Sequence, residues 1–199
     1  MSGPDDHRTY WDGEAERFDD EPDHGLGDPA TREAWRQLLA AHLPAAPADV
    51  VDVGCGTGTL ALLLADAGHR VRGVDLAPRM VERARAKAGD AGLDVPFTVG
   101  DAADPPYEPG STDVVLCRHV LWALPDPASA LARWTALLRP GGRLVLVEGR
   151  WHTGGGLTAA ESERLVGAQW GDVRVVAMPD EVFWGGPITD ERYLLVART

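Results

Sequence analysis

The chain has 199 residues, 44% of them hydrophobic and 25% charged, which is typical of one globular domain with a sizeable core. Its formal net charge of -12 disfavours nucleic acid and anionic membrane surfaces as partners, because both attract basic proteins. The acidic first residues lack the basic and apolar regions of a signal peptide, and no apolar run reaches the roughly 20 residues of a membrane span, so we predict a cytoplasmic protein.

Residues 1–30 form an acidic segment that is interrupted by proline and glycine and carries the aromatic residues Tyr10, Trp11 and Phe18. We interpret this segment as a helical lid, with a frayed tail as the alternative. Residues 31–199 are expected to form the main domain. The first helix near its start is predicted in the stretch DPATREAWRQLLAAHL, with Asp28 as N-cap and Pro29 in the first turn.

Strand-like and helix-like patterns then alternate along the chain. Strands are predicted at 49–53, 70–75, 95–101, 112–117 and 143–149, and helices at 59–68, 77–89, 126–142 and 158–170. This alternation indicates an α/β fold, a doubly wound parallel sheet with helices on both faces. The last two strands, 173–178 and 193–198, are joined by a loop too short for a crossover helix, so we expect them to pair antiparallel.

A glycine-rich turn, VGCGTGTL, follows the first predicted strand. Gly54, Gly56 and Gly58 let the backbone approach a ligand at the carboxyl end of the sheet, where such folds bind their ligands. The spacing is G-x-G-x-G, not the G-x-G-x-x-G of dinucleotide-binding turns, and the Gly-Lys-Ser/Thr of a P-loop is missing. The turn therefore favours a nucleoside without a phosphate. A nicotinamide-dependent oxidoreductase and a catalytically silent cofactor-binding module remain as alternatives.

Acidic residues end the next two predicted strands. Asp75 lies about twenty residues after the glycines, where a carboxylate can accept hydrogen bonds from ribose hydroxyls. Asp101 can accept from the amine of adenine, while the backbone N–H of Ala102 can donate to a ring nitrogen. For each carboxylate, a role in a helix cap or a turn is the alternative.

Three stretches together resemble the class I S-adenosylmethionine (SAM)-dependent methyltransferases: VVDVGCGTGTLALLLADAGHRVRGVDLAPRMVERAR, VGDAADPPYEPGSTDVVLCRHVLWALPDP and LLRPGGRLVLVEG. The resemblance covers roughly residues 45–150. It implies a Rossmann-like sheet of seven mostly parallel strands with an antiparallel last strand, SAM as cofactor, and methyl transfer to a small-molecule acceptor. The expected cofactor-binding residues, two of them from the lid, are Trp11, Phe18, Asp52, Gly54, Cys55, Gly56, Gly58, Asp75, Leu76, Met80, Asp101, Ala102, Cys117 and Arg118.

Methyl transfer from a sulfonium is an in-line displacement, which needs an aligned acceptor and exclusion of water. A base is needed only where the acceptor is protonated, as a phenol is at neutral pH. His119, after the fourth strand, and His24, in the lid, are the catalytic candidates, each with a packing or loop role as the alternative. Glu148 ends the fifth strand and is expected either to contact substrate or to cap a helix.

The remaining candidates have weaker signals. Trp122, Trp151 and Trp184 follow predicted strand ends or lie between the last two strands, and they suggest an aromatic pocket for a planar or apolar acceptor, with ordinary packing as the alternative. The only lysine, Lys87, is expected on a helix surface. No CxxC or HExxH motif is present, so we predict no metal site. The acceptor atom and the oligomeric state are left open.

Overall fold

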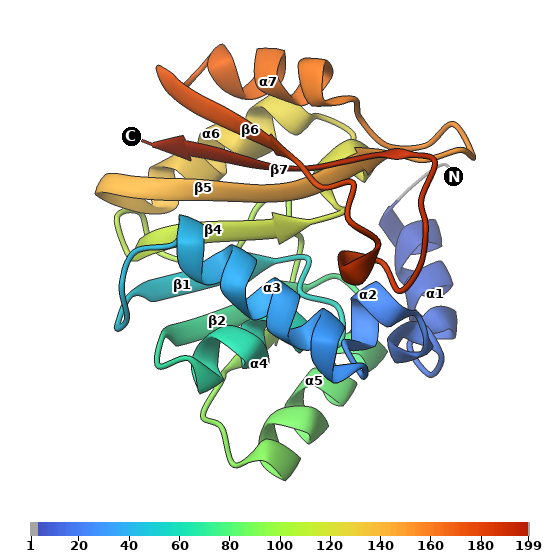
Figure 1. Ribbon diagram of the computed structural model, residues 1–199. Helices are drawn as coiled ribbons and strands as arrows, with labels where there is room; N and C mark the ends of the chain where they lie inside the picture. The colour runs from blue at the N-terminus through green and yellow to red at the C-terminus, as the bar shows by residue number, and fades with distance from the viewer. Residues whose placement is uncertain (1–3, 199) are drawn as a thin grey trace.

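Seven strands pair into one mixed sheet in the computed structural model, which describes residues 4–198 (Figure 1). The strand order is β3-β2-β1-β4-β5-β7-β6. The strands are β1 (Asp49–Val53), β2 (Arg70–Asp75), β3 (Phe97–Val99), β4 (Thr112–Arg118), β5 (Leu138–Arg150), β6 (Asp172–Ala177) and β7 (Glu191–Arg198). β1 to β5 pair in parallel, and β7 runs antiparallel to both of its neighbours. The predicted α/β class and the antiparallel last strand are confirmed, although β6 and not β7 forms the edge.

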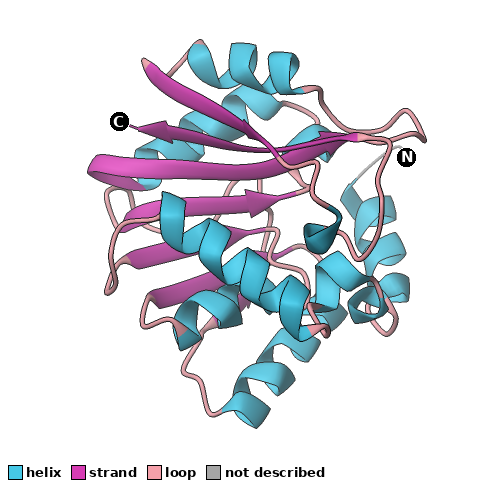
Figure 2. Cartoon of the chain, viewed as in Figure 1, coloured by secondary structure: helices cyan, strands magenta, loops and turns pink. Residues whose placement is uncertain are grey.

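Helices cover both faces of this sheet (Figure 2). The helices of the main domain are α3 (Pro29–His42), α4 (Thr59–Asp66), α5 (Pro78–Ala91), α6 (Pro127–Leu137) and α7 (Ala159–Gly167). The first three share one apolar core with the sheet, and the last two share another. Neighbouring residues of β1 divide between these cores, Val50 in the first and Val51 in the second, because side chains alternate along a strand.

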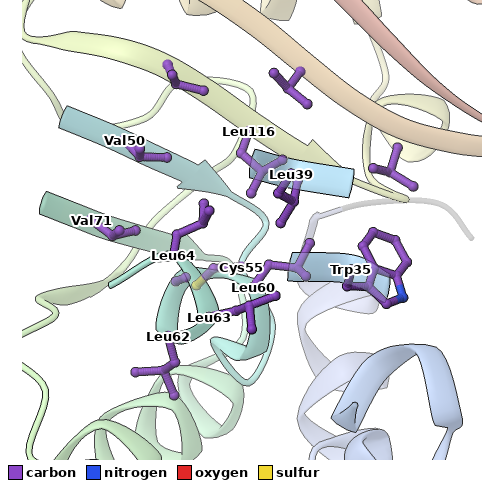
Figure 3. Close-up of a cluster of buried hydrophobic side chains, with 14 of the residues drawn as sticks. Trp35, Leu39, Val50, Cys55, Leu60, Leu62, Leu63, Leu64, Val71 and Leu116 are labelled. Atoms are coloured by element: carbon purple, nitrogen blue, oxygen red, sulfur yellow. The ribbon is translucent and has the colours of Figure 1, made fainter. Parts of the chain in front are cut away.

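The larger core ties α3 and α4 to the sheet (Figure 3). Trp35 and Leu39 of α3 are fully buried near Leu60 of α4, as the apolar spacing of α3 predicts. The indole Nε1 of Trp35 also donates to the backbone oxygen of Phe183 at 3.1 Å. This contact fastens the segment between β6 and β7 to the helix that follows the N-terminal segment.

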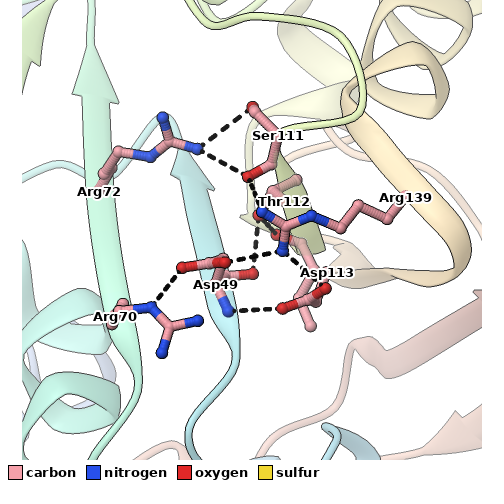
Figure 4. Close-up of polar contacts among 8 residues, drawn as sticks. Asp49, Arg70, Arg72, Ser111, Thr112, Asp113 and Arg139 are labelled. Carbon is pink, nitrogen blue, oxygen red and sulfur yellow. Dashed lines mark hydrogen bonds and ion pairs between the residues drawn. The ribbon is translucent and has the colours of Figure 1, made fainter.

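An ion-pair cluster holds the amino ends of the central strands (Figure 4). Arg139 Nη1 lies 2.7 Å from Asp49 Oδ2 and 2.9 Å from Asp113 Oδ1, and Arg70 Nε donates to Asp49 Oδ1 at 2.7 Å. The hydrogen bonds from these guanidinium groups, first that from Arg70, lower the pKa of Asp49 to about 2. Because Asp49 begins β1, this cluster stabilises the end of the sheet opposite the glycine-rich turn.

All four of the helices predicted after the first strand end at other residues than expected, α4 at Asp66 and α7 at Gly167 among them, and the other two differences have a visible cause. The helix expected at 126–142 ends at Leu137, because Leu138 already pairs with Thr112 and begins β5. The helix expected to end at Gly89 continues to Ala91, where Gly92 adopts the left-handed conformation that ends it. Strand pairing at Leu138 therefore sets the end of α6, and the backbone conformation of Gly92 sets the end of α5.

The N-terminal segment is helical in its described part, with α1 (Pro4–Glu14), the 3₁₀ helix η1 (Phe18–Asp20) and α2 (Pro22–Gly25). In Figure 1, α1 and α2 lie on the side of the molecule toward which the arrowhead of β4 points. This segment therefore lies beside the carboxyl ends of the strands. Among residues 4–198, no helix combines the length and apolar composition that crossing a bilayer would need.

Candidate active site

The turn from β1 into α4 requires glycine at each of its three glycine positions. Gly54, Gly56 and Gly58 all have positive φ, at 71°, 54° and 78°. A Cβ on Gly54 would lie 2.3 Å from a methyl carbon of Val120, and one on Gly58 would lie 2.7 Å from the ring of Phe97. The turn is thus fixed by backbone conformation and by close packing on both sides.

A cavity lies over this turn at the carboxyl ends of β1, β2 and β4. Both catalytic candidates, His24 and His119, line it. Twelve of the fourteen residues expected to bind cofactor also line it: Trp11, Phe18, Asp52, Gly54, Cys55, Gly56, Asp75, Leu76, Met80, Asp101, Ala102 and Arg118. The structure thus brings together residues from the N-terminal segment and from the ends of four strands.

Gly58 and Cys117, the other two expected cofactor residues, are not among the lining residues. Gly58 faces Phe97 and Ala84, so it lets α4 and α5 pack closely over the turn. Cys117 is fully buried in the core beneath α6, and burial raises the pKa of its thiol. Both are neighbours in the chain of residues that line the cavity, but they face the packed interior.

Sequence reasoning missed part of the cavity wall. His7, which carried no signal in the sequence, lines the cavity from α1, and Val120, Ala123 and Leu124 line it from the stretch after β4. Ala123 belongs to a 3₁₀ helix, η2 (Leu121–Ala123), and Val120 and Leu124 flank it. The sequence pattern did not indicate this helix. The only advance signal of these three residues was their position directly after His119.

The cavity floor carries two carboxylates, Asp52, which is buried, and Asp75, which is partly buried. Asp75 Oδ2 accepts from the backbone N–H of Gly56 at 2.8 Å, and its Oδ1 accepts from that of Ala77 at 2.9 Å. Burial raises the pKa of Asp75, and these two bonds act in the opposite direction. Burial also raises the pKa of Asp52 to about 7, although the positive charge of Arg118 counteracts it. Since desolvated carboxylates gain from a nearby cation, this floor suits a positively charged ligand.

Arg118 provides a partly buried positive charge in the same cavity. Its Nη1 donates to the backbone oxygen of Asp23 in α2, and its guanidinium lies 5.5 Å from the ring centre of Trp35. Burial lowers its pKa, while the carboxylates of Asp23 and Asp52 favour its charged form. A guanidinium and a carboxylate that face one cavity match a ligand with a carboxylate and an ammonium group.

The two histidines approach each other at the cavity, with ring centres 6.5 Å apart. Burial lowers the pKa of His24, and burial together with the charge of Arg118 lowers that of His119 well below its ordinary value. Nδ1 of His24 and Nε2 of His119 are buried and have no hydrogen-bond partner among the described residues. Both rings are therefore neutral at neutral pH, and each can accept a proton.

The three tryptophans gather around His119. Trp151 meets its ring edge-on at 5.2 Å, Trp184 stacks on it at 6.1 Å, and Trp122 lies 5.4 Å from Trp151 between ring centres. None of the three is among the residues that line the cavity. In this structure they hold the catalytic candidate in place, which is the packing alternative of the sequence analysis.

Asp23, His24 and His119 form a cluster whose potential ligand atoms all lie within 4.8 Å of one another. Two imidazoles and a carboxylate can bind a transition metal. Here, however, the charge of Arg118 lowers the pKa of both histidines, and the same charge opposes a metal cation. Burial and the charge of Arg118 thus disfavour a metal cation here, and they keep both imidazoles unprotonated in the free protein.

Polar contacts hold the N-terminal segment against the glycine turn and α5. Asp19 accepts from Thr57 Oγ1 at 2.5 Å and from Lys87 Nζ at 3.0 Å, and Lys87 also donates to Thr59 at 2.8 Å. Lys87 was expected on a surface, but its side chain is only 30% exposed because Asp19 covers it. Asp12 accepts from the backbone N–H of Arg79 at 2.8 Å, which attaches α1 to the start of α5.

The fold and the cavity define a Rossmann-like protein whose cavity suits a nucleoside ligand carrying a positive charge. Residues 51–146 match a family described as "Methyltransferase domain". This match, together with the relatives and solved structures that follow, supports a class I SAM-dependent methyltransferase.

Curated relatives match the same central part of the chain. A ubiquinone biosynthesis O-methyltransferase of Xanthomonas euvesicatoria is 39% identical over 55% of this chain and 46% of its own length. A demethylmenaquinone methyltransferase of Deinococcus radiodurans is 40% identical over 57% of this chain and 48% of its own length. The chain thus spans about half the length of the curated relatives it matches.

Solved structures extend the likeness in fold to most of the chain. The [4+2]-cyclase SpnF has a TM-score of 0.72 at 20% identity, covering 84% of this chain and 81% of its own. A geranyl diphosphate methyltransferase, in complex with geranyl diphosphate and sinefungin, has a TM-score of 0.69 at 21% identity, covering 83% and 78%. At this identity the likeness concerns the fold alone.

Proposed function

We propose that this protein transfers the methyl group of SAM to a small-molecule acceptor, and that the acceptor atom is the oxygen of an acidic hydroxyl such as a phenol. The observation that carries the proposal is the cavity itself. It joins a glycine turn and the carboxylates of Asp52 and Asp75 on one side to two neutral imidazoles on the other. The first side suits a sulfonium nucleoside, and the second suits removal of a proton.

The residues present fit SAM in the chemistry of their donors and acceptors. Asp75 would accept from the ribose hydroxyls, and Asp52 and Arg118 would pair with the ammonium and carboxylate of the methionine part. Asp101 Oδ1 already accepts from the backbone N–H of Ala103 at 2.8 Å, so its second oxygen is the one offered to the adenine amine. The backbone N–H of Ala102 would donate to the ring. When bound, SAM supplies an electrophilic methyl group on a sulfonium.

His119 is the proposed base and His24 the second candidate. SAM would supply the methyl group to the acceptor oxygen and leave as the neutral thioether, and Nε2 of His119 would take up the hydroxyl proton that the acceptor loses. A phenol with a pKa of roughly 10 needs such a base at neutral pH. The presence of an O-methyltransferase among the relatives supports oxygen as the acceptor atom.

Residues 1–30 are proposed to act as the lid, with residues 1–3 outside the described part of the chain. Trp11 and Phe18 line the cavity, and a Cβ on Gly56 would lie 3.1 Å from the ring of Phe18. A closed lid would exclude water from the methyl transfer. A cytoplasmic location and the absence of a nucleic-acid partner stay predictions.

Calorimetric titration and a methylation screen test the proposal. S-adenosylhomocysteine (SAH) should bind in the micromolar range while NAD does not, and a library of phenols should yield a product heavier by about 14 daltons, one CH₂. The variant His119→Asn should lose most turnover but keep SAH affinity, whereas His69→Asn, a control outside the cavity lining, should keep both. Binding of NAD without SAH would favour the oxidoreductase, and binding of SAH with no product from any acceptor would favour the silent module.

A further inference from the structure

We propose that Glu148 is a positioning residue of the methyl-transfer site, one that sets the orientation of His119 and the adjoining cavity wall by holding the backbone of residues 120–122. This inference rests on the proposed function of the cavity. Glu148 lies near the end of β5 with an exposure of 0%, and it is not among the residues that line the cavity. It acts, therefore, through the residues that it contacts.

Its carboxylate caps the 3₁₀ helix η2. Oε1 accepts from the backbone N–H of Leu121, the first residue of η2, at 2.9 Å. The N–H groups of Val120 and Trp122 also face the carboxylate and favour its ionised form. Of the two roles that the sequence left open for Glu148, the structure thus shows the cap.

The cap matters because His119 has an uncommon backbone conformation. Its φ is +60°, in the left-handed region, which non-glycine residues adopt rarely and keep only where their surroundings hold them. The N–H of His119 donates to the oxygen of Val147 at 2.9 Å, and its own oxygen accepts from Trp122 Nε1 at 3.0 Å. Val147 and Glu148, consecutive residues of β5, thus hold the chain on both sides of the turn that aims His119 at the cavity.

The same backbone carries the cavity wall. Val120, Ala123 and Leu124 line the cavity beside His119, and Val120 packs against the glycine turn at Gly54. A small rotation of η2 would therefore move the base and the wall together. Loss of the cap should affect turnover more than cofactor affinity, because the carboxylates of the floor lie on β1 and β2.

Because Glu148 can ionise, the strength of the cap should depend on pH. The titratable groups that face it are the Cys117 thiol on β4 and the Tyr193 hydroxyl on β7. Burial raises the pKa of Glu148 to about 8, against the backbone N–H groups that lower it. Oε2 is buried and has no hydrogen-bond partner among the described residues. The ionised form, which binds the N–H groups more strongly, therefore gains population as the pH rises through about 8.

Two variants of Glu148 and one matched control test the proposal. Glu148→Gln keeps an oxygen that can accept from Leu121 but cannot ionise, and Glu148→Leu has no acceptor. Glu163→Gln, an exposed site on α7, is the control. We expect Glu148→Leu to lower kcat at least tenfold with less than a threefold change in SAH affinity. Glu148→Gln should recover most of kcat but lose the rise of kcat through pH 8 that the wild type and control show.

The position of the His119 ring is a readout that does not require turnover. Its imidazole carbon resonance, assigned from a His119→Asn variant, should shift in Glu148→Leu and stay in place in Glu148→Gln. Unchanged kcat and resonance in Glu148→Leu, or a rise through pH 8 that persists in Glu148→Gln, would overturn the proposal. If Glu148→Leu fails to fold, the pH profile of Glu148→Gln decides alone. A wild type without any methyl transfer refutes the proposed function instead, and the resonance still tests the cap.

Discussion

The contact of Lys87 with the lid gives the sharpest prediction for dynamics. We expect Lys87→Met to weaken closure of the N-terminal segment over the cavity, because methionine keeps the aliphatic stem but removes the ammonium. That ammonium joins Asp19 of the lid to Thr57 and Thr59 of the glycine turn, at 3.0, 3.2 and 2.8 Å. Asp19 would keep its bond from Thr57 and a longer contact of 3.7 Å with Arg83.

The size of the effect follows from exposure and geometry. Exposed ion pairs are worth about 0.2–1 kcal/mol, whereas hydrogen bonds to charged groups reach about 1.5–3 kcal/mol. The side chains of Lys87 and Asp19 are 30% and 22% exposed, so the contact lies between these limits. We expect a loss of about 1–2 kcal/mol in lid closure, which corresponds to SAH binding weakened roughly 5- to 30-fold.

Calorimetry and limited trypsin digestion measure the two consequences. SAH should bind Lys87→Met more weakly, and cleavage after Arg17, an exposed lid residue, should accelerate at an unchanged melting temperature. Arg164→Met removes the same charge from the exposed face of α7 and is the control. If both variants match the wild type in SAH affinity and in cleavage rate, then Lys87 does not hold the lid closed.

Three further predictions concern the cavity floor and the histidine cluster. Asp75→Ala should weaken SAH binding by about 1–3 kcal/mol, since ribose hydroxyls and the Gly56 N–H lose their acceptor; an unchanged Kd in calorimetry would remove that role. Asp52, with its pKa of about 7, should be about half protonated at pH 7 without ligand and should ionise beside the ammonium of SAH. Titrations in buffers of different ionisation enthalpy should then show release of about half a proton, and none in Asp52→Asn. Dialysis against EDTA should leave turnover intact; loss restored by a divalent metal would instead assign a metal to Asp23, His24 and His119.

The sequence predicted well which residues lie together around the glycine turn, because its signals there are local. The positive φ values of Gly54, Gly56 and Gly58 arise within five residues, and Asp75 and Asp101 follow strands whose apolar runs are plain in the sequence. Parallel pairing then brings these strand ends to one edge of the sheet without further information. Local sequence pattern and sheet topology were together sufficient to predict that these residues lie close to one another.

The remaining parts depend on contacts between distant segments. Lys87 was expected on the surface because the residues around it are polar, but its partner Asp19 lies 68 positions away in sequence. His7 and the helix η2 left no periodic signal, and Glu148 caps a helix that lies 27 positions earlier. No pattern within one segment can report such pairings, since each is made only when the sheet has formed.

The site combines residues from the part of the chain that matches the methyltransferase family with residues from outside it, and this combination is relevant to which acceptor the protein uses. The region shared with the methyltransferase family, residues 51–146, contains the glycine turn, the floor carboxylates and His119. The groups that surround His119 come mostly from outside it, His24 from the lid and Trp151 and Trp184 from the C-terminal part. Cofactor recognition can therefore be common to the relatives while acceptor recognition differs. A quinone precursor is consequently only one member of the phenol library, and exchange of the lid between this chain and a relative should change acceptor preference more than SAH affinity.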